Sequence, residues 1–241
     1  MTGTIINIIT VLIGGMVGMT LGDRMPGRIK ETVMAGLGLF TLAIGVQMFL
    51  DSTNPVVVLL SLLFGGLLGE WWQIERGLQR FGAVVEKRFA GGDGGSESRF
   101  VRGMLTASLV FCVGPMTILG SIQDGLYGDF LLLLIKSVLD MFAAMAFAST
   151  LGIGVLFSVI VVLVYQGGLS LLAGQAQSVL TDAMISEMTA VGGVILIGLA
   201  IGSLLEIKKI RAGNFLPALV IAPIITPLIA ALFSWLGWSG G

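Results

Sequence analysis

The sequence contains no histidine and a single cysteine, Cys112. Zinc chemistry is disfavoured because zinc sites draw on histidine and cysteine ligands. A single cysteine also excludes an intrachain disulfide, so cysteine usage does not report the redox state of the compartment. The chain lacks an HExxH motif and a P-loop, and its GLYGD segment (125–129) lacks the GxGD spacing of intramembrane aspartyl proteases. We therefore expect no enzymatic activity, no metal site and no cofactor.

Charge is scarce as well. Only 11% of the residues are charged, and 13 basic and 14 acidic side chains leave a net charge of -1. The chain therefore offers no basic surface of the kind that binds nucleic acid. In contrast, 56% of the 241 residues are hydrophobic and the mean hydropathy is +1.02. This apolar fraction exceeds what a soluble core of this size buries, so we place the chain in a lipid bilayer.

The apolar segments predict an all-α, polytopic membrane bundle that forms a single membrane domain. The N-terminal segment lacks the basic region of a cleaved signal peptide and is long enough to span a bilayer, so we count it as the first span. Eight spans are predicted at about 4–21, 33–50, 55–69, 103–120, 130–149, 153–172, 188–205 and 214–236.

Basic residues follow the odd-numbered spans, except for Lys136 inside the fifth. Twelve of the 13 therefore lie on one face, whereas the opposite loops carry only acidic charge. The positive-inside rule makes the basic face cytoplasmic and puts both termini on the outer, periplasmic side of the cytoplasmic (inner) membrane. The longest basic loop opens with an amphipathic pattern over 71–90, which predicts a helix lying either in the membrane interface or on its own bundle. A flexible linker, GGDGGSES (91–98), follows.

Glycine spacing suggests an internal repeat. LIGGMVGMTL (12–21) and LIGLAIGSLL (196–205) share one pattern, and FGGLLGE (64–70) repeats its glycine spacing. Such pairs allow close helix packing in any membrane protein, but here they recur at matched topology. Prolines also gather in the fourth and eighth spans. Together these features suggest two parallel halves of four spans, each ending in a proline-broken helix, and paired breaks of this kind are typical of transporter binding sites.

The fifth span carries both Lys136 and Asp140. With Phe130 near the surface, Asp140 lies roughly 15 Å deep at 1.5 Å per residue, near the middle of the bilayer. An unpaired charge there costs about 2.5–3.5 kcal/mol. The lysine-first order is the less favourable one for a pair within one helix, which indicates a partner on another helix. The pair either fixes the register of the helix or forms a coupling site, in which Asp140 exchanges a proton or cation while Lys136 binds an anionic group or releases Asp140.

Other polar and helix-breaking residues are candidates to complete this substrate or ion site, since unwound backbone and polar side chains coordinate solutes in transporters. They are Gly114, Pro115, Thr117, Gln123, Asp124, Glu187, Thr189, Pro223 and Thr226. The remaining polar residues within spans are expected to make hydrogen bonds between helices. These are Asn7, Gln47, Tyr165 and Gln166.

Six ordered motifs resemble a known family. They are GLGLFTLAIGVQM (36–48), CVGPMTILGSIQDG (112–125), KSVLD (136–140), FASTLGIGV (147–155), EMTAVGGVILIG (187–198) and NFLPAL (214–219). They are similar to motifs of the domain of unknown function 554 family of bacterial inner-membrane proteins. The resemblance covers nearly the whole chain and implies a multi-spanning membrane protein of a kind described as a transporter. It implies no substrate and no mechanism.

We expect a secondary transporter of a small solute or ion, coupled to protons or sodium through Asp140 or Glu187. An ion channel and a non-transporting membrane scaffold or assembly factor remain alternatives. The expected partners are the lipid bilayer and a small solute or ion, with no nucleic acid. Glycine-rich helix faces also suggest a homodimer.

Overall fold

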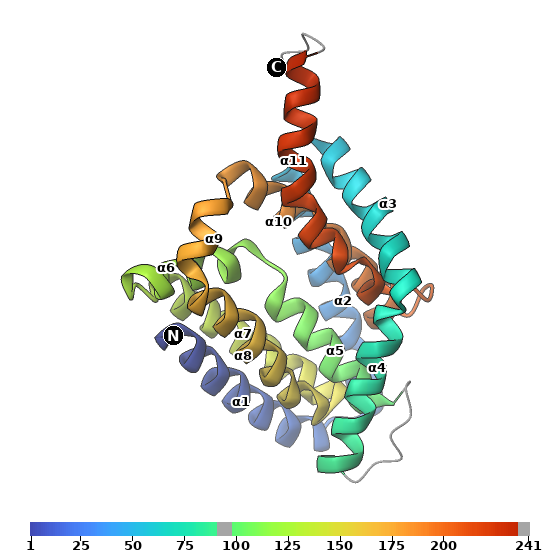
Figure 1. Cartoon of the computed structure of the whole chain (residues 1–241). Coiled ribbons are helices and arrows are strands. Elements are labelled where there is room, and N and C mark those ends of the chain that lie inside the picture. Colours follow the sequence, from blue (N-terminus) through green and yellow to red (C-terminus); the bar gives the residue numbers. More distant parts are fainter. Residues whose placement is uncertain (91–97, 236–241) are drawn as a thin grey trace.

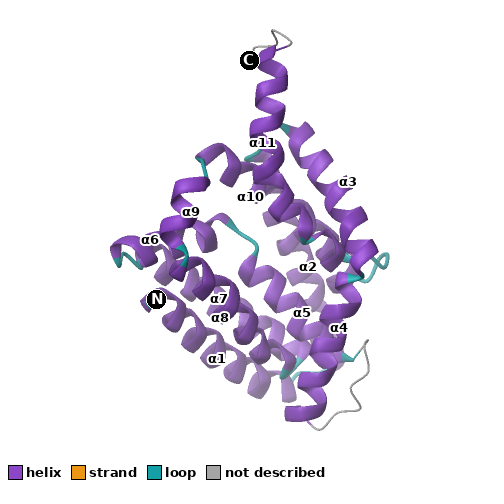
Figure 2. Cartoon of the chain, in the orientation of Figure 1, coloured by secondary structure: helices purple, strands orange, loops and turns teal. Residues whose placement is uncertain are grey.

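A computed structural model describes residues 1–90 and 98–235, except the side chains of Ala90 and Pro115. Within these ranges the chain is helical, and no strand occurs (Figure 2). The α-helices are α1 (Thr2–Asp23), α2 (Gly27–Leu50), α3 (Pro55–Trp72), α4 (Ile74–Val85), α5 (Arg99–Cys112), α6 (Pro115–Tyr127), α7 (Leu131–Leu151), α8 (Gly154–Leu171), α9 (Ala173–Val179), α10 (Asp182–Leu199) and α11 (Pro217–Trp235). Two short π-helical segments, η1 (Glu86–Ala90) and η2 (Ala200–Leu204), and one 3-10 helix, η3 (Ala212–Phe215), complete the elements of the described ranges.

In the described ranges, seven helices are long and apolar enough to cross a membrane. They are α1, α2, α3, α7, α8, α10 continued by η2, and α11 preceded by η3. A further pair, α5 and α6, passes the same test together but is bent by 65°. This bent pair occupies the position of the predicted fourth span. The chain is thus a polytopic helical bundle (Figure 1), with up to eight spans in the described ranges if the pair counts as one.

The break between α5 and α6 follows from the Gly-Pro pair in CVGPM. Pro115 is the first residue of α6, where its missing amide hydrogen matters least, and Gly114 before it is extended. The break expected in the eighth span is absent, so that prediction was wrong. Pro223 and Pro227 lie inside α11, which continues through both. Each proline removes only one hydrogen bond, and the bonds on either side hold the helix together. The two predicted halves therefore do not share a break at matching positions.

Glycines set how closely the helices approach. The most extensive interhelical contact joins α1 to α7, where Gly14, Gly18 and Gly22 lie directly against the backbone carbonyls of Met141, Met145 and Ser149. Further contacts of this kind join Gly45 of α2 to Gly193 of α10, and Gly65 and Gly69 of α3 to Ala218 and Asn214. Gly125 of α6 and Gly154 of α8 lie in the same way against the carbonyls of Ser170 and Phe100. Such contacts replace the hydrophobic drive that helices lack in lipid.

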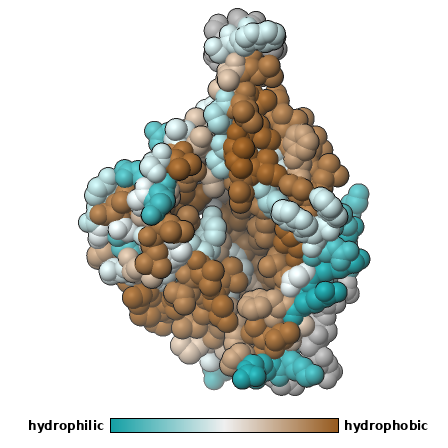
Figure 3. Space-filling model, viewed as in Figure 1, coloured by the Kyte–Doolittle hydropathy of each residue, from teal (hydrophilic) through white to brown (hydrophobic). Residues whose placement is uncertain are grey.

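The loops that carry basic residues meet at one end of the bundle, here called the basic end. Arg211 pairs with Glu70 at 2.6 Å, and Arg102 pairs with Glu206. Arg99 donates through Nε to the carbonyl of Thr150 at 2.8 Å. In Figure 3 the strongly hydrophilic residues lie mainly along the left edge, along the right side and at the bottom of the visible face, and hydrophobic residues cover most of the area between them. This is the surface expected of a protein embedded in lipid.

The predicted amphipathic segment forms α4, which is separated from α3 by Gln73 in a left-handed conformation. Trp71 and Trp72 therefore belong to the end of α3. One side of α4 packs on the bundle, because Val85 shares a core cluster with Phe100, Val101 and Met104 of α5. Of the predicted linker, residues 91–97 lie outside the described ranges. Its last residue, Ser98, caps α5 by accepting a hydrogen bond from the Val101 amide.

Candidate functional site

Lys136 and Asp140 form an ion pair within α7. Both side chains are buried, with 6% and 7% of the residue surface exposed. The pair within one helix, which the lysine-first order disfavours, is thus formed. A second partner on another helix, as expected, is also present, because Asn7 of α1 donates through Nδ2 to Oδ2 of Asp140 at 3.0 Å. The fifth predicted span therefore carries its two opposite charges inside the bundle.

The ion pair belongs to a larger set of buried polar side chains on α1, α7 and α8. Asn7 Nδ2 also donates to Oε1 of Gln166 at 3.0 Å, and Gln166 Nε2 donates to Thr4 Oγ1 at 3.3 Å. We call these five residues, Thr4, Asn7, Lys136, Asp140 and Gln166, the polar network. Asn7 Oδ1 is buried and accepts no hydrogen bond within the described chain. The network thus holds a carboxylate, an ammonium group and an unused carbonyl oxygen within the membrane-spanning bundle.

Close packing of α1 on α7 brings Asn7 to Asp140. Gly3 and Gly14 lie on either side of Asn7 along α1, and a Cβ atom at either position would collide with α7. Without side chains at these points, the short Asn7 side chain reaches the carboxylate. Sequence reasoning assigned Asn7 and Gln166 to contacts between helices, which they make, but missed their link to the charged pair. It missed Thr4 altogether, because a threonine in a span is not an unusual residue.

Thr117 stabilises the break between α5 and α6 with a side-chain hydrogen bond. Its hydroxyl donates to the carbonyl of Phe111 at 3.1 Å. In an unbroken helix that carbonyl would accept from the amide of residue 115, but proline has no amide hydrogen. Thr117 is fully buried, so it supplies the donor that lipid cannot. Thr117, a candidate for the substrate or ion site, thus stabilises the broken helix.

Replacing Thr117 with valine tests this role. The loss of the hydroxyl leaves the buried carbonyl of Phe111 without its donor, so we expect the free energy of unfolding to fall by about 1–2 kcal/mol. Thr226→Val is a matched control, because Thr226 bonds the carbonyl of Ala222, whose helical partner, the Thr226 amide, is present. Thermal unfolding of both variants in detergent measures the difference. Equal melting temperatures would contradict the assigned role.

Glu187 is fully buried at the end opposite the basic end. Its Oε1 accepts from the amide and hydroxyl of Thr53, at 2.9 and 2.8 Å, and from the amide of Asn54 at 2.8 Å. Its Oε2 accepts from the hydroxyl of Ser52 at 2.8 Å. Four donors from the loop between α2 and α3 therefore converge on this one carboxylate. These hydrogen bonds hold the loop against α10.

The carboxylate of Asp124 is also bound within the protein. It accepts a hydrogen bond from the amide of Gly3 at 3.1 Å and pairs with the amino group of Met1 at 2.8 Å. Gln123, on the same helix, is half-buried. Thr189 bonds the carbonyl of Ile185 within α10 and lines a small cavity of about 210 Å³ with Asp51 and Asp182. Pro223 and Thr226 are half-buried on α11. The structure therefore joins only Lys136 and Asp140, of all the candidate residues, into one charged site.

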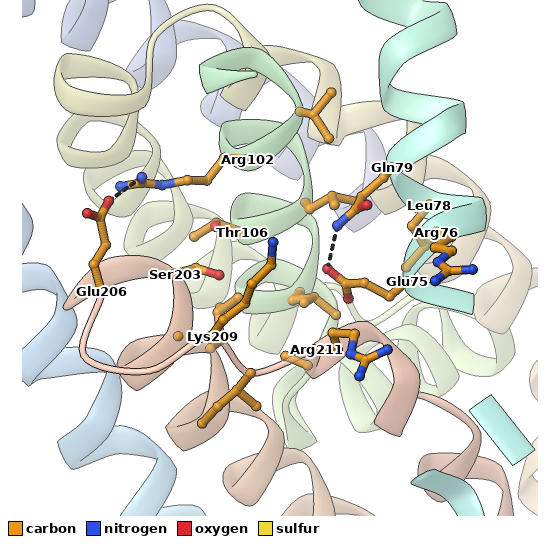
Figure 4. A pocket seen from close by; sticks show the side chains of 17 residues that line it. Glu75, Arg76, Leu78, Gln79, Arg102, Thr106, Ser203, Glu206, Lys209 and Arg211 are labelled. Carbon is orange, nitrogen blue, oxygen red and sulfur yellow. Dashed lines mark hydrogen bonds and ion pairs between the residues drawn. The ribbon is translucent and has the colours of Figure 1, made fainter. Parts of the chain in front are cut away.

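A larger cavity of about 810 Å³ opens at the basic end (Figure 4). We call it the basic-end cavity. Its walls come from α4, α5 and the segment from the end of α10 to η3. On α5 it extends inward as far as Leu109, one turn before the break at Val113 and Gly114. Lys136 and Asp140 line neither of these two cavities.

Helix α5 lies between the basic-end cavity and the core around the charged helix. Arg102, Leu105 and Thr106 face the cavity, while Ala107 and Phe111 pack into the core cluster that includes Val11 of α1 and residues of α7. Within the described residues, no group of three or more His, Cys, Asp or Glu side chains is placed to hold a metal ion.

These features define a multi-pass helical membrane protein with a charged, hydrogen-bonded site inside its bundle. The family model described as "Protein of unknown function (DUF554)" matches residues 2–227, and the chain belongs to this family, as the six motifs predict. It is 32% identical to the uncharacterized membrane protein YdfK of Bacillus subtilis (strain 168), covering 96% of this chain and 98% of that protein. It is also 32% identical to the uncharacterized protein YqgA of Escherichia coli (strain K12), covering 97% and 98% of the two chains. No solved structure matches the chain.

Proposed function

We propose that this protein is a secondary transporter of a small solute or ion and that the polar network is its coupling site. The observation that carries the proposal is the burial of Lys136, Asp140 and their amide partners among membrane-spanning helices. A buried ion pair contributes little net stability, and apolar residues of similar size often serve as well. Ionisable residues inside a membrane are therefore expected where their charge is used. The proposal involves no catalysis.

Coupling requires that Asp140 exchange partners. In the proposed cycle, a proton or cation that reaches Asp140 weakens its attraction for Lys136, and the lysine then binds an anionic group or a different acceptor. Asn7 supports either state, because its amide has donors that bond the carboxylate and an oxygen that accepts from a protonated one.

The bent pair α5–α6 is the proposed moving element. One face of α5 lines the basic-end cavity and the other packs towards the charged helix. Rotation at Val113 and Gly114, where the helix is already interrupted, would open a path between them. In keeping with the distribution of basic loops, we propose that the basic end faces the cytoplasm and that the termini face outward from the inner membrane.

The test is solute-driven coupling in proteoliposomes. Purified protein is reconstituted in phosphatidylethanolamine–phosphatidylglycerol vesicles containing a pH-sensitive or sodium-sensitive dye, and amino acids, carboxylates, phosphates and monovalent cations are added in turn. We expect one class to drive proton or sodium movement against a gradient. Asp140→Asn should reduce this movement about tenfold or more, since the substituted amide cannot carry charge. Asp23→Asn, which alters an exposed aspartate of α1, should leave it unchanged.

A double variant separates transport from folding. Lys136→Leu with Asp140→Leu removes both charges together, so it should fold as stably as the original chain but move no coupling ion. If this double variant keeps coupled flux, the polar network is not the coupling site. Flux that runs only down a gradient would indicate a channel. If every solute class gives no flux with the unmodified protein, a scaffold role replaces the proposal.

A further inference from the structure

The residues that line the basic-end cavity carry a second inference, which concerns binding and does not depend on transport taking place. Its lining includes four basic residues, Arg76, Arg102, Lys209 and Arg211, and two acidic residues, Glu75 and Glu206. The four cations come from α4, α5 and the segment after α10, so they lie far apart in the sequence and meet only in the fold. The lining residues carry two more positive than negative charges, although Arg211 is paired with Glu70 outside the lining. This balance favours an anionic ligand.

The acidic residues of the cavity are already engaged. Glu75 accepts through one oxygen from Gln79 at 3.2 Å and through the other from the amide of Gly213 at 2.8 Å. Glu206 is exposed at the rim and pairs with Arg102. These contacts reduce the repulsion that the two carboxylates would exert on an anion.

Donor groups gather on the inner side of the cavity. Figure 4 shows Lys209 pointing inward from the segment after α10, and Thr106 and Ser203 nearby on the walls, while Arg76 points outward. The Nε–H of Arg102 is buried and makes no hydrogen bond within the described chain. The cavity also lies beside the first turns of α5, whose helix dipole adds partial positive charge.

The deeper wall is apolar. Leu105 and Leu109 of α5, Leu199 of α10 and Ile210 form it. A ligand that fills a cavity of about 810 Å³ is therefore larger than a simple ion and has an uncharged part. The basic and hydroxyl side chains on the inner side of the cavity come from α5 and from the segment after α10, so they approach from different directions. This arrangement suits the tetrahedral oxygens of a phosphate group better than the planar pair of oxygens of a carboxylate.

We propose that the basic-end cavity binds an organic phosphate. The phosphate lies among Arg102, Lys209, Thr106 and Ser203, and the organic part contacts the leucines of the deeper wall. Two sources have this chemistry, a free phosphorylated solute and the headgroup of an acidic phospholipid. Basic cavities between membrane helices are a known setting for acidic headgroups.

Binding measurements on the full chain in phosphatidylcholine nanodiscs test the proposal. The probes are glycerol 3-phosphate, for the free solute, and dioctanoyl phosphatidylglycerol, for the lipid headgroup. Glycerol and dioctanoyl phosphatidylcholine are the uncharged and zwitterionic controls. We expect saturable binding of at least one anionic probe by isothermal titration calorimetry. Arg102→Gln combined with Lys209→Gln should weaken it about tenfold or more, as expected when charged hydrogen bonds are lost.

The matched control is Arg28→Gln, which removes an exposed positive charge of α2 outside the cavity and should leave the affinity unchanged. Binding of glycerol 3-phosphate supports a free solute, and binding of phosphatidylglycerol alone supports a lipid. Two results would overturn the proposal. Either neither anionic probe binds, or the double variant binds the probe as tightly as Arg28→Gln and the unmodified chain do. The binding measurement requires no coupled flux, so failure of the transport proposal leaves the outcome interpretable.

Discussion

Gly18→Val should sharply destabilise the folded protein. A Cβ atom at Gly18 would lie against the backbone carbonyl of Met145, closer than van der Waals contact allows. A backbone atom in a packed helix cannot move aside as a flexible side chain does, so α1 and α7 must separate. Overpacking costs about 1–3 kcal/mol, and the same separation would stretch the hydrogen bond from Asn7 to Asp140. For a chain of this length each kcal/mol lowers the melting temperature by roughly 2–4 °C.

Gly36→Val is the matched control for this prediction. Gly36 also lies within a membrane-spanning helix, but a Cβ atom there would meet nothing within 4 Å. Thermal unfolding in detergent, followed by size-exclusion chromatography, compares the two variants. Similar melting temperatures would show that α1 and α7 pack less closely than in the structure. The hydrogen bond from Asn7 to Asp140 would then be doubtful as well.

Glu187→Gln should markedly destabilise the folded protein. The carboxylate accepts from four donors, and an amide in its place turns one oxygen into a donor that faces other donors. Loss of charged hydrogen bonds in a buried site costs about 1.5–3 kcal/mol. We therefore expect a clear fall in melting temperature and faster proteolysis of the loop between α2 and α3.

Asp182→Asn provides the comparison, since Asp182 is an exposed carboxylate in the first turn of the same helix. Its substitution should cost less than about 1 kcal/mol. The result also separates two roles for Glu187. If Glu187→Gln kept full stability but lost coupled flux in proteoliposomes, the residue would belong to the transport machinery, as its sequence context first indicated.

Composition and periodicity predicted the all-helical membrane bundle because lipid demands long apolar helices. The prolines predicted a break in the fourth span, and it is present there because Pro115 follows an extended glycine and begins a new helix. The same reasoning failed for Pro223 and Pro227, which stand without such a glycine and remain inside α11. Proline alone therefore does not specify a break.

Of the candidate site, only the two residues whose burial in the membrane costs the most free energy could be predicted from the sequence. Two charges in an apolar span stand out in any sequence, so Lys136 and Asp140 were identified. The partners of Glu187 could not be identified, because Ser52, Thr53 and Asn54 lie more than 130 positions away and resemble an ordinary polar loop. Asn7 and Gln166 were similarly recognisable as polar but not as neighbours of Asp140.

The three glycines of α1 also have a kinetic consequence. Gly14, Gly18 and Gly22 each lie against a carbonyl of α7, so sliding α1 by a single position would drive side chains into the opposing backbone at two or three places at once. The two helices should consequently move as one rigid body. In the proposed transport cycle, the hinge of any motion that exposes Asp140 to alternate sides of the membrane would then lie outside α1 and α7.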